Sequence, residues 1–259
     1  MQIALTIAGS DSGGGAGVQA DLKTFFRFGV FGTSAITAIT AQNTRGVARW
    51  SAVAVDLIRA QIDAVAADLR PAAVKTGMLA DAAVVAEVAA AIRDHGLGPL
   101  VLDPVMVATS GDPLLEAGAV DMIRCELLPL AAIVTPNLDE AELLLGEPVR
   151  DVASMRRAAG RLVRELGAKA ALIKGGHLTT DRLCDVLFDG AEWRLFEHAR
   201  IETRSTHGTG CTLSSAIAAH LALGAPLAAA VSASLDYVHR AIAEAPGLGG
   251  GHGPLNHFV

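Results

Sequence analysis

The sequence predicts an α/β fold in which helices cover both faces of a central, mainly parallel sheet. Short apolar runs alternate with helix-like segments along the whole chain, as in proteins built from strand–helix–strand units. No fixed-period repeat, charge run or Pro/Ser-rich linker divides the 259 residues. With 51% hydrophobic and 19% charged residues, the chain can form one large core. We therefore expect a single domain over residues 1–259.

The first half of the chain predicts strands at short apolar runs, with amphipathic helices between them. In chain order these are strand 3–8, helix 18–28, strand 34–39, helix 56–69, strand 73–76, helix 81–95 and strand 100–103. Asp56 is expected to cap the second helix, because Asp at this position accepts a bond from the first free backbone N–H groups. Gly96 ends the third helix, where a left-handed residue is common.

The second half continues this alternation and adds a hairpin. In chain order the elements are helix 115–128, strand 132–135, helix 138–145, helix 152–166, strand 170–174, strands 184–189 and 192–197, and helices 210–223 and 226–243. Gly167 stops the helix before it, and Asp189-Gly190 is a typical hairpin turn.

Charge and cysteine usage exclude several classes of protein. The formal net charge of −6 argues against a nucleic-acid surface, which needs a basic patch. No signal peptide is evident, and the most apolar region is interrupted by His220 and Gly224, so we expect no membrane span. The three cysteines form no CxxC pair, which favours a reducing, cytoplasmic location. We expect Cys125 and Cys184 in the core, and His257 in an ordinary tail.

Polar and glycine-rich segments follow most of the predicted strands. They are Ala8-Gly-Ser-Asp11, Thr40-Ala-Gln-Asn43, Lys75-Thr-Gly-Met78, Asp103-Pro-Val-Met106, Thr135-Pro-Asn137 and Lys174-Gly-Gly-His177. Sheets of this class bind ligands beyond the carboxyl ends of their strands. One rim therefore gathers the unusual chemistry, which predicts an active site there.

The segment Thr206-His-Gly-Thr-Gly-Cys-Thr212 precedes a helix-like run and is the most informative motif. The first turn of a helix has free N–H groups and a positive dipole end, so it attracts anions. Glycines allow a phosphoryl group to approach the backbone, and a thiol at this place can have a lowered pKa. The alternative is a simple turn and cap with a buried cysteine.

Two other segments have structural and functional interpretations. The loop from Gly9 to Gly17 lacks the spacing of a dinucleotide fingerprint or P-loop, so we expect either a flexible connector or a loop close beneath a small substrate. In the second interpretation Asp21, on the following helix, faces inward. Asn137 and Glu140 form an ordinary capping arrangement, or alternatively bind Mg²⁺ beside phosphate oxygens.

Together these motifs resemble a known family, the hydroxymethylpyrimidine/phosphomethylpyrimidine kinases of thiamine biosynthesis, in the ribokinase-like superfamily. The resemblance runs nearly end to end. It is carried by Ala8-Gly-Ser-Asp, Gly14-Gly-Ala-Gly-Val-Gln-Ala-Asp21-Leu-Lys-Thr, Ala41-Gln-Asn-Thr, Lys75-Thr-Gly-Met, Asp103-Pro-Val-Met, Ser110-Gly-Asp-Pro-Leu-Leu, Thr135-Pro-Asn-Leu-Asp-Glu-Ala, Lys174-Gly-Gly-His and Thr206-His-Gly-Thr-Gly-Cys. Thr109 departs from the pattern, since many relatives have lysine there.

The resemblance implies a three-layer ribokinase-like fold and a homodimer that uses ATP and Mg²⁺. It implies phosphorylation of 4-amino-5-hydroxymethyl-2-methylpyrimidine to its monophosphate and then to its diphosphate. Matching positions place Gln42 on the pyrimidine, surrounded by Gly9, Asp21, Met78 and Val105. The residues matched to the nucleotide or metal are Asp103, Asn137, Glu140, Lys174 and Thr209, with Asp103 and Glu140 as the metal ligands.

The same resemblance assigns Cys211 to the acceptor hydroxyl, as its base or as the group that orients it. Lys174 and the amides from Gly208 to Cys211, which include those of Thr209 and Gly210, would stabilise the transferred phosphoryl group. The nearest alternative is a pyridoxal kinase, against which Gln42 argues. A sugar kinase of this superfamily would have aspartate at position 211. A non-catalytic nucleotide-binding regulator would bind ATP without substrate-dependent ADP release.

Overall fold

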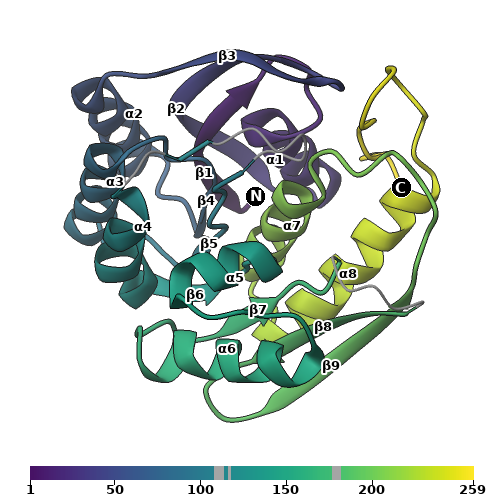
Figure 1. Ribbon diagram of the computed structural model, residues 1–259. Helices are drawn as coiled ribbons and strands as arrows, with labels where there is room; N and C mark the ends of the chain where they lie inside the picture. The colour runs from purple at the N-terminus through teal and green to yellow at the C-terminus, as the bar shows by residue number, and fades with distance from the viewer. Residues whose placement is uncertain (108–113, 116–117, 177–181) are drawn as a thin grey trace.

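The computed structural model describes residues 1–107, 114–115, 118–176 and 182–259. Within these ranges nine strands form one sheet in the order β3-β2-β1-β4-β5-β6-β7-β8-β9 (Figure 1). Their bounds are β1 Ile3–Asp11, β2 Phe31–Asn43, β3 Gly46–Ala52, β4 Ala73–Thr76, β5 Leu100–Leu102, β6 Ala131–Val134, β7 Ala171–Ile173, β8 Arg182–Phe188 and β9 Trp193–Ala199. The pairs from β2 through β7 are parallel, and β3, β8 and β9 add antiparallel edges.

Helices cover both faces of this sheet, which confirms the predicted fold class. Their bounds are α1 Gly17–Arg27, α2 Val55–Asp68, α3 Ala82–Asp94, α4 Ala119–Met122, α5 Leu138–Leu145, α6 Val152–Arg164, α7 Thr209–Ala222 and α8 Leu227–Ala243. Figure 1 shows α7 lying centrally across the sheet. None of the helices in the described ranges is long and apolar enough to cross a bilayer.

Two apolar cores separate the three layers. On one face, residues such as Leu5 and Leu102 pack against α2 through α6. On the other, residues such as Ala4 and Val101 pack against α1, α7 and α8. Side chains alternate between the faces because successive residues of a strand point in opposite directions.

Most predicted elements are present, but two differ for identifiable reasons. Strand β3 was not predicted, because it is an edge strand with exposed or half-buried side chains and no buried alternating face. The prediction of a helix over 115–128 was wrong in its extent. Its described part ends in a π-helical turn, Ile123–Leu127, followed by a 3₁₀ turn that contains Pro129, which lacks the N–H needed to continue an α-helix.

Several local predictions were also wrong. Helix α2 begins after Ala54, so Asp56 lies in its first turn and does not cap it. Cys125 is exposed, whereas Cys184 is buried as expected. His257 is buried and its Nε2 lies 3.1 Å from Thr212 Oγ1 of α7, so the end of the chain is part of the packed structure. Thr109, where the family pattern is broken, lies outside the described residues.

Candidate active site

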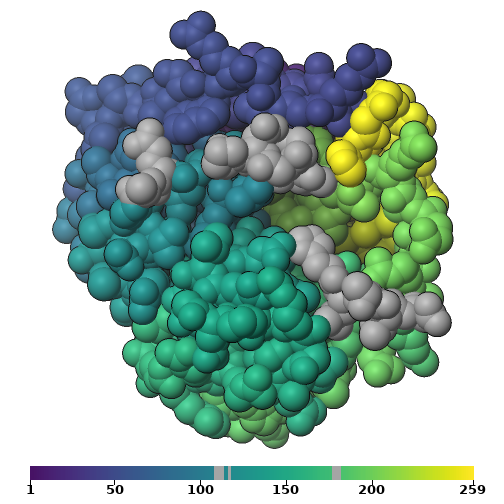
Figure 2. Space-filling model, in the orientation of Figure 1, coloured from purple at the N-terminus to yellow at the C-terminus, as the bar shows by residue number. Residues whose placement is uncertain are grey.

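A cavity of about 800 Å³ opens beyond the carboxyl ends of the parallel strands. Figure 2 shows the surface hollowed where the blue, teal and green parts of the chain meet. Gln42 and Cys211 both line this cavity, together with Lys174. The strand ends thus bring together residues from positions far apart in the sequence, as predicted from the rim of polar segments.

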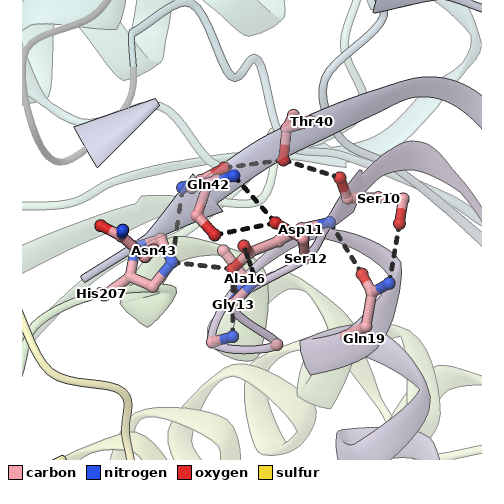
Figure 3. Close-up of polar contacts among 12 residues, drawn as sticks. Ser10, Asp11, Ser12, Gly13, Ala16, Gln19, Thr40, Gln42, Asn43 and His207 are labelled. Carbon is pink, nitrogen blue, oxygen red and sulfur yellow. Dashed lines mark hydrogen bonds and ion pairs between the residues drawn. The ribbon is translucent and has the colours of Figure 1, made fainter. Parts of the chain in front are cut away.

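One side of the cavity, which we name the loop wall, consists of Asp11, Thr40, Gln42 and His207 (Figure 3). The Asp11 carboxylate accepts hydrogen bonds from three backbone amides of the first loop. These are Gly13 N at 2.7 Å, Gly15 N at 3.0 Å and Ala16 N at 2.9 Å. The loop is therefore a fixed part of the site and not a flexible connector.

The Asp11 carboxylate also lies 2.8 Å from His207 Nε2. Burial alone would raise the pKa of Asp11, but the bonds from His207 and the loop amides outweigh it and lower that pKa. Asp11 is accordingly a carboxylate near neutral pH, and it connects the first loop to the loop that precedes α7.

Gly208 shows how closely these two loops approach each other. It has φ of +81°, and a Cβ built on it would lie 1.8 Å from the carbonyl oxygen of Gly15. Any side chain at Gly208 would push the two loops apart, because it would collide with the Gly15 backbone, which cannot rotate away as a side chain could. The glycine is thus needed where the chain enters α7.

Gln42 lies on β2, next to a register shift in the β2–β3 pairing, and not in a loop as predicted. Its Oε1 lies 3.2 Å from Thr40 Oγ1, and its Nε2 lies 3.5 Å from His207 Nε2. Nearby, Met78 and Val105 provide apolar lining, and a Cβ on Gly9 would lie 3.0 Å from the Met78 sulfur. The amide of Gln42 thus lies on the loop wall of a cavity that also has apolar lining, which suits a flat polar ring.

The opposite side of the cavity, the charged wall, consists of Asp103, Glu140 and Lys174. Lys174 Nζ lies 3.2 Å from Asp103 Oδ1 and 3.7 Å from Glu140 Oε2. Although burial opposes the charge, the two carboxylates raise the pKa of Lys174 to about 12. Burial and the charge of Asp103 raise the pKa of Glu140 to about 7. Two acids thus share one cation here.

Asn137 and Glu140 form the predicted capping arrangement at the start of α5. Asn137 Oδ1 accepts from Glu140 N at 2.9 Å, and Glu140 Oε2 accepts from Asn137 N at 2.8 Å. Both residues also line the cavity. The capping interpretation is confirmed. The Mg²⁺ interpretation stays open, because the cap uses only one of the two Glu140 carboxylate oxygens.

Helix α7 begins between the two walls. Thr209 directs both its amide and its hydroxyl to the Thr206 carbonyl oxygen, at 3.3 and 2.7 Å, so its amide is already occupied. Helix geometry leaves the next amides, those of Gly210 and Cys211, without partners inside the helix. A Cβ on Gly210 would lie 3.1 Å from Lys174 Nζ, which places this amide pair beside the charged wall.

The expectation of a lowered Cys211 pKa was wrong. Burial, with the nearby charges of Asp21 and Asp103, raises the pKa of the thiol to about 11, although Lys75 and the Gly17 amide act in the opposite direction. Desolvation therefore has a larger effect on the pKa of this thiol than the start of the helix has. Cys211 is a neutral thiol in this structure near pH 7.

The prediction that Asp21 contacts the substrate also disagrees with the structure. Asp21 is fully buried and does not line the cavity. Its carboxylate binds Lys75 Nζ at 2.8 and 2.9 Å, and it accepts from Thr6 Oγ1 and Ser215 Oγ, each at 2.6 Å. The residue does face inward, but toward the layer between α1, α7 and the sheet.

Sequence reasoning missed Lys75, Asp11 and His207 as site residues. Lys75 lines the cavity from β4 and is fully buried, so a charged residue inside an apolar strand was the available signal. Asp11 and His207 stand in motifs that were identified, but nothing in the sequence pairs residues 196 positions apart.

A magnesium ion fits the donor set of the charged wall. No group of three His, Cys, Asp or Glu side chains in the described part of the chain forms a cluster suited to a metal. Asp103 and Glu140 nevertheless provide carboxylate oxygens at one place, with two negative groups against the single Lys174. Mg²⁺ usually keeps several waters and binds through one or two carboxylates plus phosphates, so this partial set is the appropriate one.

The chain is similar to kinases of known sequence and structure. The chain is 54% identical over 259 residues to the hydroxymethylpyrimidine/phosphomethylpyrimidine kinase of Rhizobium meliloti, covering 99% of this chain and 97% of the relative. Its fold is similar to that of Bacillus subtilis pyridoxal kinase, solved as an ADP complex, with a TM-score of 0.92 and 39% identity over 99% and 97% of the two chains. It is also similar to a phosphomethylpyrimidine kinase from Clostridium difficile 630, with a TM-score of 0.83 and 42% identity over 93% and 100%.

A sequence model described as phosphomethylpyrimidine kinase matches residues 11–256, which is almost the whole chain. The match includes Gln42, both walls of the cavity and Cys211. The chain therefore belongs to the phosphomethylpyrimidine kinase family.

Proposed function

We propose that this chain, as a single kinase domain, transfers a phosphoryl group from ATP to the hydroxymethyl oxygen of 4-amino-5-hydroxymethyl-2-methylpyrimidine. It then phosphorylates the resulting monophosphate to the diphosphate, a reaction of thiamine biosynthesis. The observation that carries the proposal is that Gln42, Cys211 and Lys174 line one cavity. Membership of the family and 54% identity to a kinase of this name support it.

The loop wall is suited to an aminopyrimidine. One amide has both a donor and an acceptor, so Gln42 can pair with the ring nitrogen and the exocyclic amine together. Met78 and Val105 would cover the apolar parts of the ring, and Gly9 leaves room for it. Recognition of this kind discriminates strongly, because a ligand without the amine leaves a buried polar group unpaired.

Cys211 would act on the acceptor hydroxyl in the first step. As a base it takes the hydroxyl proton onto sulfur, and as an orienting group it holds the oxygen toward the phosphoryl group. The raised pKa makes the neutral thiol the resting form, so the base role depends on a small thiolate fraction. In the second step the accepting phosphate oxygen is already ionised and needs no base.

The charged wall would hold the transferred phosphoryl group and the nucleotide. Phosphoryl transfer requires mainly positioning and charge stabilisation. Lys174 and the amides of Gly210 and Cys211 supply positive charge and donors at one place. Asn137 and Thr209 also line the cavity and would contact the nucleotide.

We further propose that Asp103 and Glu140 hold Mg²⁺ together with the ATP phosphates. Bound there, the ion would neutralise phosphate charge during transfer. The residues supply oxygens and an excess of negative charge, and Lys174 balances only part of it.

A homodimer in the cytoplasm is also proposed. Large apolar side chains are exposed on the surface, including Phe26 at 84%, Phe31 at 51% and Ile39 at 59%, and a second copy could cover some of them. All three cysteines are free thiols, which suits a reducing compartment. Sedimentation of the purified chain tests the oligomeric state.

Pyridoxal phosphorylation is a second candidate, because the fold is so similar to that of a pyridoxal kinase. The test is to supply the purified chain with ATP, Mg²⁺ and either alcohol at equal concentration, and to separate the products by chromatography. We expect the pyrimidine to give the monophosphate first and the diphosphate later, and to turn over faster than pyridoxal. ADP release that does not depend on either alcohol would contradict both kinase assignments.

A further inference from the structure

The side-chain amide of Gln42 has two ends of equal shape, and its neighbours determine which end carries the oxygen (Figure 3). One end lies 3.5 Å from His207 Nε2 and the other 3.2 Å from Thr40 Oγ1. The orientation matters because this amide would form the hydrogen bonds to the pyrimidine. The inference therefore rests on the proposed function.

His207 must act as a donor at Nε2. This nitrogen lies 2.8 Å from Asp11 Oδ2, which as a carboxylate can only accept. Nε2 therefore carries a hydrogen and has no lone pair left for Gln42. An N–H group of Gln42 facing it would place two donors against each other, whereas an oxygen there would accept part of the His207 hydrogen.

Thr40 leads to the same orientation from the other end. Its hydroxyl lies 2.9 Å from the Ser10 carbonyl oxygen, which can only accept. The single hydroxyl hydrogen is used in that shorter bond, so the Thr40 oxygen is left as an acceptor toward Gln42. A nitrogen of Gln42 satisfies it, and an oxygen does not.

The structure places Gln42 Nε2 at the His207 end and Oε1 at the Thr40 end, but the hydrogen-bonding partners favour the reverse. We infer that His207, held by Asp11, is a positioning residue that turns the oxygen of the Gln42 amide toward itself and the nitrogen toward Thr40. The backbone of His207 is fixed separately, since its N–H donates to the Gly253 carbonyl oxygen at 3.1 Å. The residue is only 7% exposed, so water does not easily replace the contact.

This orientation determines which way the pyrimidine lies. The exocyclic amine donates to the amide oxygen and the ring nitrogen accepts from the amide nitrogen. In the substrate the hydroxymethyl group is on the carbon next to the one that carries the amine. An oxygen on the His207 side therefore directs the hydroxymethyl group to the side of the loop that leads to Cys211. The reversed amide would bind the ring equally well but point the hydroxyl away.

A double-mutant cycle tests this role. We expect His207→Phe, which keeps a ring but removes the donor, to lower kcat/KM for the first phosphorylation about tenfold. Calorimetry without ATP should show the Kd for the pyrimidine changed less than about threefold, because reversed binding is still binding. The KM for ATP should stay within about twofold. In a Gln42→Leu background, His207→Phe should have less than about a twofold effect on kcat/KM.

Rescue and a second variant keep the test independent of folding. His207→Gln retains an N–H donor and should recover most of the lost kcat/KM. If His207→Phe melts far below the parent, Thr40→Val and Thr40→Ser provide the same comparison from the other end of the amide, with the same lack of effect in Gln42→Leu.

The outcomes separate the two proposals. Equal losses from His207→Phe with and without Gln42, or a Kd that weakens as much as kcat/KM falls, would show a merely structural histidine and overturn the inference. An unmodified chain that neither binds nor phosphorylates the pyrimidine would instead overturn the proposed function.

Discussion

Acidic side chains in the two cavity walls have pKa values shifted in opposite directions. In the loop wall the one carboxylate, Asp11, is satisfied by His207 and three loop amides, and its pKa is lowered. In the charged wall Asp103 and Glu140 share Lys174, and the pKa of Glu140 is raised to about 7. A balanced wall can recognise a neutral ring, whereas a wall with excess negative charge is stabilised by a cation.

The difference extends to how each wall is built. Backbone amides and a close glycine contact at Gly208 fix the loop wall. Side chains from the ends of β5, α5 and β7 form the charged wall, which gains its order from ion pairs. Variants that remove a charge should therefore affect phosphoryl transfer, while variants that remove a neutral donor should affect how the pyrimidine is oriented in the cavity.

Loss of Lys174 should have the largest effect. We expect Lys174→Met to lower kcat for both phosphorylations by about 10²–10³-fold, because a charge-stabilising donor is removed from the phosphoryl group. The Kd for the pyrimidine, measured by calorimetry, should be nearly unchanged. Lys169→Met, at an exposed lysine, is the matched control. A comparable loss of pyrimidine binding would mean that the walls do not act separately.

Cys211→Ala should damage the two steps unequally. We expect the first phosphorylation to slow about 10²-fold, as for loss of a group acting on the proton, and the second to slow by less than about threefold. Separate assays that start from the alcohol and from its monophosphate measure this. Cys125→Ala, at the exposed cysteine, should leave both rates alone. Equal losses in the two assays would reject a role on the hydroxyl.

The pH profile distinguishes the two roles of Cys211. Its pKa of about 11 means that the thiolate fraction rises about tenfold per pH unit between pH 7 and 9. If the thiolate is the base, kcat of the first step should rise with that slope while the second step stays flat. If kcat of the first phosphorylation does not change with pH, but Cys211→Ala still slows that step, the cysteine is an orienting group.

The sequence predicted the parts of this site that follow from strand order. Gln42 and Lys174 come after apolar runs, and parallel strands bring their carboxyl ends to one edge, whereas the Gly208–Cys211 segment was found from its glycine-rich helix start. The family resemblance then assigned roles to these positions. Their presence around one cavity is a geometric fact that strand alternation alone could anticipate.

The remaining features depend on three-dimensional burial and pairing. Asp21 faces inward as expected, but only the structure shows that its carboxylate binds Lys75 and does not reach the cavity. The Cys211 pKa depends on desolvation, which a motif does not reveal. The contact between Asp11 and His207 joins two loops distant in the sequence, and no local pattern encodes it.

Acid should lower the stability of the segment packed behind the loop wall, without acting on phosphoryl transfer itself. Burial, with the charge of Lys23, lowers the pKa of His257 to about 4 from an ordinary value of 6.5. The unfolded chain therefore binds more protons than the folded one between these pH values. This contribution is fully present above pH 6.5 and is lost as the pH falls to about 4, at a cost of at most about 3 kcal/mol.

The His257→Gln variant isolates this contribution. The introduced amide would keep a polar partner for Thr212 on α7 but cannot titrate, so the free energy of unfolding should decline less between pH 6.5 and 4 than in the parent. Urea denaturation at several pH values measures it, with His252→Gln at an exposed histidine as the control. If His257→Gln and the parent lose stability in parallel, the histidine is accessible to protons in the folded state. The packing of the chain end against α7 would then be looser than the contacts of Thr212 and Tyr237 indicate.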